Sequence, residues 1–167
     1  MQQYQALLHR LWLFYSPFED ALLGGLSADA SAKVADRRKA RWLFEDIQSL
    51  GYQSPIAGDP SLPELNSDAE RMGALYVLEG ATLGGALIRK QLIKTFGDRI
   101  NGALRFYTGY GSDSSRQWIS FRMILSEMFD TQDISRRNDV VAGANATFLF
   151  LEAWLGDGDN LTALEQP

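Results

Sequence analysis

The segment from residue 71 to 96 combines a long apolar pattern of helical period with glycines at Gly73, Gly80, Gly84 and Gly85. Each glycine inside a helix costs roughly 0.5–1 kcal/mol of stability relative to alanine. At about 3.6 residues per turn, Gly73, Gly80 and Gly84 fall on one stripe of the helix. A stripe without side chains lets the backbone approach either a second helix or a flat, bulky ligand. The pattern alone favours the second helix.

His9 is the one histidine of the chain, and there is no cysteine. A di-iron carboxylate site needs paired Glu-x-x-His motifs, but the residue three positions before His9 is Ala6. A His/Cys zinc site or a Ser-His-Asp hydrolase would depend on His9 without any supporting motif. The GATLGG segment at 80–85 is not followed by Gly-Lys-Ser/Thr, so it is not a phosphate-binding loop. We therefore interpret His9 as a structural side chain.

The composition is typical of a soluble globular protein: 46% of the 167 residues are hydrophobic and 22% are charged. A net charge of −5 argues against a nucleic-acid partner. No run of eighteen apolar residues or secretory signal is present, so we expect neither a membrane span nor export. The absence of cysteine suits a reducing compartment, and we expect a cytoplasmic location.

Helical periodicity covers most of the chain and predicts helices at about 2–23, 29–50, 71–96, 114–129 and 133–155, with a short turn at 100–106. Pro17 is expected to interrupt or kink the first helix, because Ser16–Glu19 has the form of a capping box. In the second helix, the basic cluster Arg37, Arg38, Lys39 and Arg41 is interleaved with acidic residues and predicts a solvated face.

The central helix has sequence signals at both ends. Ser67 and the following acidic residues predict its start, and Gly97 predicts its end. Residues 51–65 hold three of the five prolines and are expected to connect helices inside one domain. No segment alternates with a period of two. The sequence therefore predicts an all-α, single-domain, multi-helix bundle over residues 1–167.

Residues 75–85, LYVLEGATLGG, closely resemble the distal-helix motif of heme oxygenases, especially the bacterial type found beside bacteriophytochromes. Weaker matches occur in the same order along the family pattern: Tyr15–Glu19, Tyr110-Gly111 with Trp118 and Phe121, and Ala146–Phe148 with Glu152, Trp154 and Leu155. Together they cover nearly the whole chain. The resemblance moves our interpretation of the glycine stripe from helix packing toward a heme-facing surface.

The resemblance implies a heme oxygenase-like bundle in which heme lies between a proximal and a distal helix. Heme is then both substrate and cofactor. Steric confinement and an ordered water network direct activated O₂ onto a meso carbon, and the macrocycle opens to biliverdin with release of CO and iron. An active protein would also need an electron donor.

The family motif transfers a catalytic role to Gly80 and Gly84. The same resemblance implies heme contacts from Gly80, Ala81, Thr82, Gly84, Gly85 and, toward the propionates, Arg116. Ala81 departs from the family pattern, in which that position is usually polar and supports the water network.

The iron ligand is the second departure, because the family's proximal histidine lies on a helix ahead of the segment that matches Gln5–Leu23. His9 is not its equivalent, and the chain is expected to lack that helix. A shortened start, ligation by methionine or tyrosine, and loss of heme turnover are the three explanations. The alternatives to an enzyme are a noncatalytic module that binds a tetrapyrrole or a partner protein, and a purely structural bundle. A TenA-like thiaminase is disfavoured because the cysteine nucleophile is absent.

Overall fold

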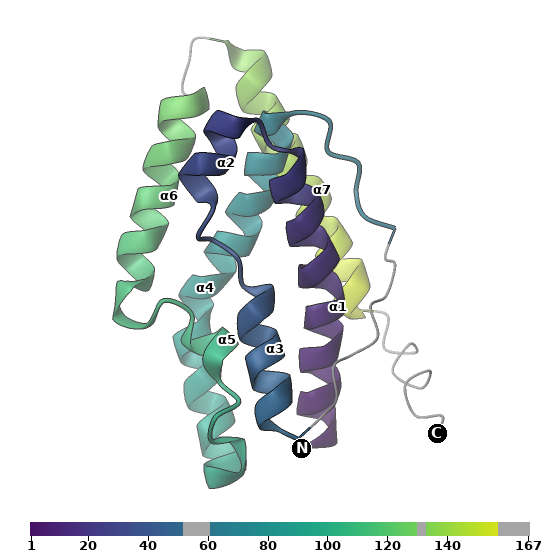
Figure 1. Cartoon of the computed structure of the whole chain (residues 1–167), viewed down its shortest axis with the longest axis vertical. Coiled ribbons are helices and arrows are strands. Elements are labelled where there is room, and N and C mark those ends of the chain that lie inside the picture. Colours follow the sequence, from purple (N-terminus) through teal and green to yellow (C-terminus); the bar gives the residue numbers. More distant parts are fainter. Residues whose placement is uncertain (52–60, 130–132, 157–167) are drawn as a thin grey trace.

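The computed structural model describes residues 1–51, 61–129 and 133–156, and within these ranges every regular element is helical (Figure 1). The elements are α1 (Gln2–Gly25), α2 (Ala28–Val34), α3 (Ala40–Ser49), α4 (Asp68–Phe96), η1 (Gly97–Ile100), α5 (Arg105–Thr108), η2 (Gly111–Asp113), α6 (Ser114–Phe129) and α7 (Ile134–Gly156). The all-α prediction is confirmed. None of the described helices is both long and apolar enough to cross a membrane.

Helix α4 is the central element and runs through the bundle with α6 on one side and α7 on the other (Figure 1). It begins as predicted, because Ser67 accepts a hydrogen bond from the Glu70 amide while the Glu70 side chain accepts one from the Ser67 amide. It ends at Gly97, which has a φ of 56° that favours glycine. The four interior glycines do not break it.

Helix α1 continues through Pro17, so the predicted interruption there is wrong. Phe14, Tyr15, Phe18 and Leu22 are all buried on its inner face, and this packing outweighs the hydrogen bond lost at proline. Glu19 does not form the predicted cap. Its carboxylate instead accepts hydrogen bonds from the amides of Lys39 (2.7 Å) and Ala40 (3.1 Å), which start α3.

The predicted helix at 29–50 is two helices, because the chain leaves the helical path at residues 35–39. The break turns Arg37 and Lys39 inward, where only 7% and 1% of their surfaces are exposed. The predicted solvated basic face is therefore wrong for these two residues. Arg38 and Arg41 remain at the surface and form ordinary ion pairs with Asp20 and Glu45.

The short elements that follow α4 pack against the side of that helix. The predicted turn at 100–106 is replaced by η1 and α5, which flank an irregular segment. Asp46 of α3 accepts hydrogen bonds from the amides of Arg105 (2.6 Å) and Phe106 (2.9 Å) and so caps α5. Helices α6 and α7 follow the predicted ranges closely. Helix α7 is only partly buried, and its apolar residues Val141 and Phe148 are exposed.

Candidate functional site

Helix α7 crosses α4 at Gly73, where the two backbones touch. A Cβ atom on Gly73 would lie 1.9 Å from the carbonyl oxygen of Val140, and one on Gly143 would lie 2.0 Å from that of Glu70. No side chain of any size fits at either position. At this end of the glycine stripe, close helix packing is the correct interpretation.

Beyond the crossing, the same stripe is open. A Cβ atom at Gly84 would meet nothing within 4 Å, and one at Gly80 would meet only the Trp118 ring, at 3.6 Å. Tyr76, Leu83 and Leu87 lie on the same side of the helix and are 42%, 46% and 75% exposed. We call Tyr76, Gly80, Leu83, Gly84 and Leu87 the open face of α4. It is apolar and has bare backbone at its centre.

An aromatic wall from α6 borders this open face. The rings of Tyr76 and Trp118 have centroids 4.8 Å apart, and Trp118 stacks on Phe121 at 6.4 Å. Phe121 is fully buried and anchors the wall in the core. Aromatic side chains next to exposed backbone form a surface suited to a flat, apolar ligand.

The structure brings only some of the predicted site residues to the open face. Gly80 and Gly84 lie together there, and Ala81 is exposed beside them. Thr82 is half-buried, and its hydroxyl donates to the Glu79 carbonyl oxygen at 2.7 Å. Gly85 faces nearly the opposite way, because a Cβ there would lie 2.6 Å from the Tyr107 carbonyl oxygen.

Arg116 stands apart from the open face. It is exposed and forms an ion pair of 2.8 Å with Asp113 in the first turn of α6. It precedes Trp118 by two positions, and residues at that spacing do not share a side of a helix. Its predicted role toward propionates is therefore not supported by its position, and it stays a prediction.

A cavity of about 330 Å³ lies next to the open face, between α4 and the start of α6. Leu83 belongs to both, and the lining is rich in hydroxyl groups with one guanidinium: Thr82, Leu83, Ala86, Arg89, Tyr107, Thr108, Gly111, Ser112, Ser114 and Ser115. Hydroxyl and guanidinium donors suit the polar edge of a ligand whose flat part rests on the open face.

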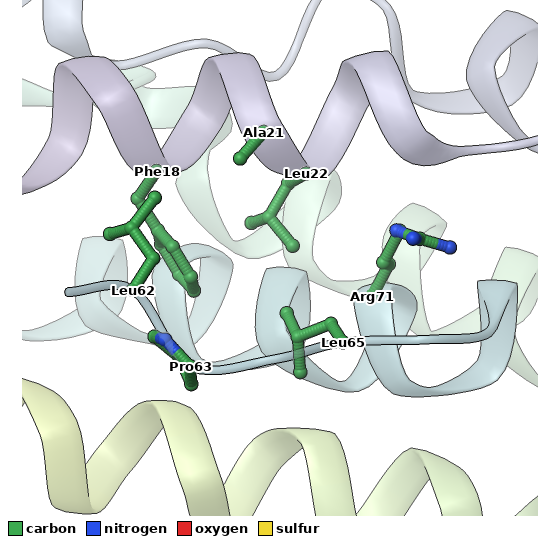
Figure 2. Close-up of a pocket in the computed structure, with 7 residues that line it drawn as sticks. All are labelled: Phe18, Ala21, Leu22, Leu62, Pro63, Leu65 and Arg71. Atoms are coloured by element: carbon green, nitrogen blue, oxygen red, sulfur yellow. The ribbon is translucent and has the colours of Figure 1, made fainter.

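A second cavity, of about 160 Å³, lies between α1 and the segment before α4 (Figure 2). Its lining consists of Phe18, Ala21, Leu22, Leu62, Pro63, Leu65 and Arg71. Arg71 precedes Gly80 by nine residues, which places the two on opposite sides of α4. This cavity is therefore separate from the open face.

A buried ionic cluster surrounds Glu79, the residue before Gly80, and the sequence analysis missed it. Glu79 accepts hydrogen bonds from Arg37 at 2.7 Å, from the ammonium of Lys39, and from the Tyr110 hydroxyl at 3.0 Å. The available signal was that Glu79 is the single charged residue in the apolar segment 72–88. A lone charge in a buried stretch needs a buried partner.

Burial shifts the pKa values of several groups around α4 and α5. It raises the pKa of Tyr110, an effect that the neighbouring Glu79 carboxylate reinforces. Burial also raises the pKa of Asp46 to about 6, although the amides of Phe106 and Arg105 oppose that shift. His9 is half-buried on α1, and burial lowers its pKa, which favours the neutral imidazole.

Comparison with known proteins agrees with the resemblance of the distal motif. The family model described as heme oxygenase matches residues 1–157. The chain belongs to the heme oxygenase family. It is 32% identical over 145 residues to a heme oxygenase from Xanthomonas campestris pv. campestris (strain 8004), and the alignment covers 87% of this chain and 84% of that protein. No solved structure matches significantly.

Membership in the heme oxygenase family gives the open face a specific interpretation. Gly80 and Gly84, for which the resemblance led us to expect heme contacts, are the glycines of the stripe that the fold leaves uncovered. Gly73 lies just before the motif at 75–85 and packs against α7 instead.

Proposed function

We propose that the chain binds heme on the open face of α4 and cleaves it, with O₂ and an electron donor, to biliverdin, CO and iron. The observation that carries this proposal is the empty space over Gly84, in the middle of an exposed apolar face. A planar macrocycle needs backbone at this position, because any side chain would hold it away from the helix. Heme is thus both the substrate and the group that supplies the redox chemistry.

The chain contributes positioning to this reaction. Gly80 and Gly84 allow close approach, and Ala81 and Thr82 flank that contact. Trp118 limits sideways movement because its ring stands beside Gly80. Arg89 and the hydroxyl groups of the 330 Å³ cavity are placed to bind the carboxylates at the polar edge of heme.

We further propose that this is a cytoplasmic protein of the bacterial, phytochrome-associated type of heme oxygenase. The LYVLEGATLGG motif at 75–85 supports the type, and the lack of cysteine fits a reducing compartment. The iron ligand remains unassigned. Among the described residues there is no cluster of three or more His, Cys, Asp or Glu that could hold a metal ion.

The second candidate is a tetrapyrrole-binding protein without turnover, and Ala81 favours it. This exposed methyl stands where the resemblance leads us to expect a polar side chain of the water network. Without such a group, ordered water near the reacting meso carbon would have fewer partners.

Hemin titration followed by turnover separates the two candidates. We expect a saturable Soret band and then, with reductant and O₂, its replacement by the spectrum of biliverdin with release of CO. Binding without that conversion would favour the noncatalytic protein. If hemin gives no saturable band, the open face is not a heme site and both candidates fail.

A further inference from the structure

Arg37 connects α4 to α6 through the buried ionic cluster. Its Nη1 atom donates to Glu79 Oε2 at 2.7 Å and to the carbonyl oxygen of Gln117 at 3.3 Å. Its guanidinium also lies over the Phe121 ring, 5.2 Å from the centroid. Arg37 comes from the 35–39 linker, so one side chain from a third segment joins the two helices that border the open face.

The two α6 residues that Arg37 contacts bracket Trp118. Gln117 precedes it, Phe121 follows it by one turn, and the Trp118 and Phe121 rings are stacked. Trp118 in turn stands beside Gly80, since a Cβ atom added there would lie 3.6 Å from its ring. The position of Arg37 therefore determines how far the aromatic wall reaches over the open face.

Charge neutralisation alone does not explain Arg37. Lys39 already pairs with the other oxygen of Glu79, and its ammonium also donates to the Arg37 carbonyl oxygen at 2.9 Å. A guanidinium, unlike an ammonium, is planar and stacks on aromatic faces while it donates hydrogen bonds, and that of Arg37 lies over the Phe121 ring. What Arg37 adds to this pair is the link to α6.

We propose that Arg37 is a specificity-determining positioning residue: through Gln117 and Phe121 it holds Trp118 beside Gly80 and so sets the in-plane orientation of the bound tetrapyrrole. This inference rests on the proposed function. A macrocycle on the open face can rotate about the axis normal to its plane, and the Trp118 ring stands against its edge. The meso carbon that reacts follows from that rotation.

The test compares Arg37→Met with Arg38→Met in the full chain. Methionine keeps an apolar stem of similar length and removes every donor, while Lys39 still pairs with Glu79. Arg38 is the matched control because it is exposed and pairs with Asp20 at the surface. The readout is the pattern of hyperfine-shifted heme methyl resonances in the proton NMR spectrum of the ferric hemin complex, which reports in-plane orientation without turnover.

We expect one dominant set of methyl resonances in the unmodified chain and in Arg38→Met. Arg37→Met should show a second set amounting to at least about one tenth of the total, with hemin binding still saturable. The biliverdin isomers, separated by chromatography, should change in the same proportion. An unchanged methyl pattern in folded Arg37→Met would overturn the inference.

Arg37→Lys keeps the charge and serves if Arg37→Met does not fold. It should also produce the second set of resonances, because an ammonium does not stack on the Phe121 ring as the planar guanidinium does. An unchanged pattern in Arg37→Lys would then overturn the inference. If the unmodified chain binds no hemin, the proposed function and this inference fail together. If the variant binds hemin with an unchanged methyl pattern, only the inference fails.

Discussion

The two halves of α4 carry glycines on the same stripe but in opposite surroundings. At Gly73 the backbone of α7 lies so close that a Cβ atom has no space, while at Gly84 a Cβ atom would meet nothing. Helix α7 therefore covers the first part of the stripe and leaves the second part open. A small-residue stripe does not have one meaning along its length, because its neighbours change.

The energetics of the two halves differ in the same way. Gly73 and Gly143 allow a close crossing that brings many atoms into contact, which offsets their low helix propensity. Gly84 has the same propensity cost with no packing in return. A helix with an unpacked glycine in its interior is less stable than the same helix with alanine there. The proposed heme contact gives a reason for glycine at position 84.

The crossing is the place where the largest loss of stability is expected. Gly73→Ala places a methyl group 1.9 Å from the Val140 carbonyl oxygen, and backbone cannot move aside as a side chain can. We expect a loss of about 3 kcal/mol in the free energy of unfolding, measured by urea denaturation. A loss below about 1 kcal/mol would mean that α7 shifts easily and that the crossing is not tight.

The open half is backed by α5, and we expect this backing to depend on pH. Burial raises the pKa of Asp46 from 3.8 to about 6, so the folded state binds an extra proton between these values. Stability relative to Asp46→Asn should therefore fall as pH rises from about 4 to 6, by an amount on the order of 2–3 kcal/mol, and then level off. Urea denaturation across this range measures it, and a difference that is flat or grows with pH would contradict the assignment.

Ligand binding should distinguish the two halves most directly. Gly84→Leu fills the open face and should weaken hemin binding at least about tenfold, with the helical circular dichroism retained. Gly24→Leu is the matched control. A Cβ atom at Gly24 also meets nothing within 4 Å, but this residue lies at the end of α1 and not on the open face. Equal hemin affinity in the two variants would count against the open face as the binding site.

Alanine at Gly84 should increase the free energy of unfolding, whereas alanine at Gly73 should decrease it. Gly84→Ala adds a methyl group in empty space and gains helix propensity, so the free energy of unfolding should rise by about 0.5–1 kcal/mol. Urea denaturation beside Gly73→Ala provides the direct contrast. A loss of stability on Gly84→Ala would show that the backbone there is already in contact with another group.

The smallest effect is expected at His9 on α1. His9→Ala should leave the Soret spectrum of the hemin complex almost unchanged, because the resemblance leads us to expect that the segment carrying His9 is not the proximal helix. Absorption spectroscopy of the variant is the measurement. Loss of the Soret band would instead identify His9 as an iron ligand and place heme toward α1.

The sequence by itself was sufficient for features that depend on neighbours along the chain. Helical periodicity, the Ser67–Glu70 capping box and the Gly97 terminus define α4 through interactions within a few residues of each end. The motif at 75–85 led to the family for a related reason, since its glycines are recognisable by type and spacing alone. Local signals of this kind survive in the folded structure.

Only the tertiary structure decided which glycine packs and which stays open, because that depends on where α7 crosses α4 from more than sixty residues away. It also decided that the chain breaks at 35–39, where Glu79 on a distant helix draws Arg37 and Lys39 into the core. A buried carboxylate is costly without a cation, and that demand is invisible in the local pattern around residue 37. Likewise, Pro17 stays helical because the core holds Tyr15 and Phe18 in place on either side of it.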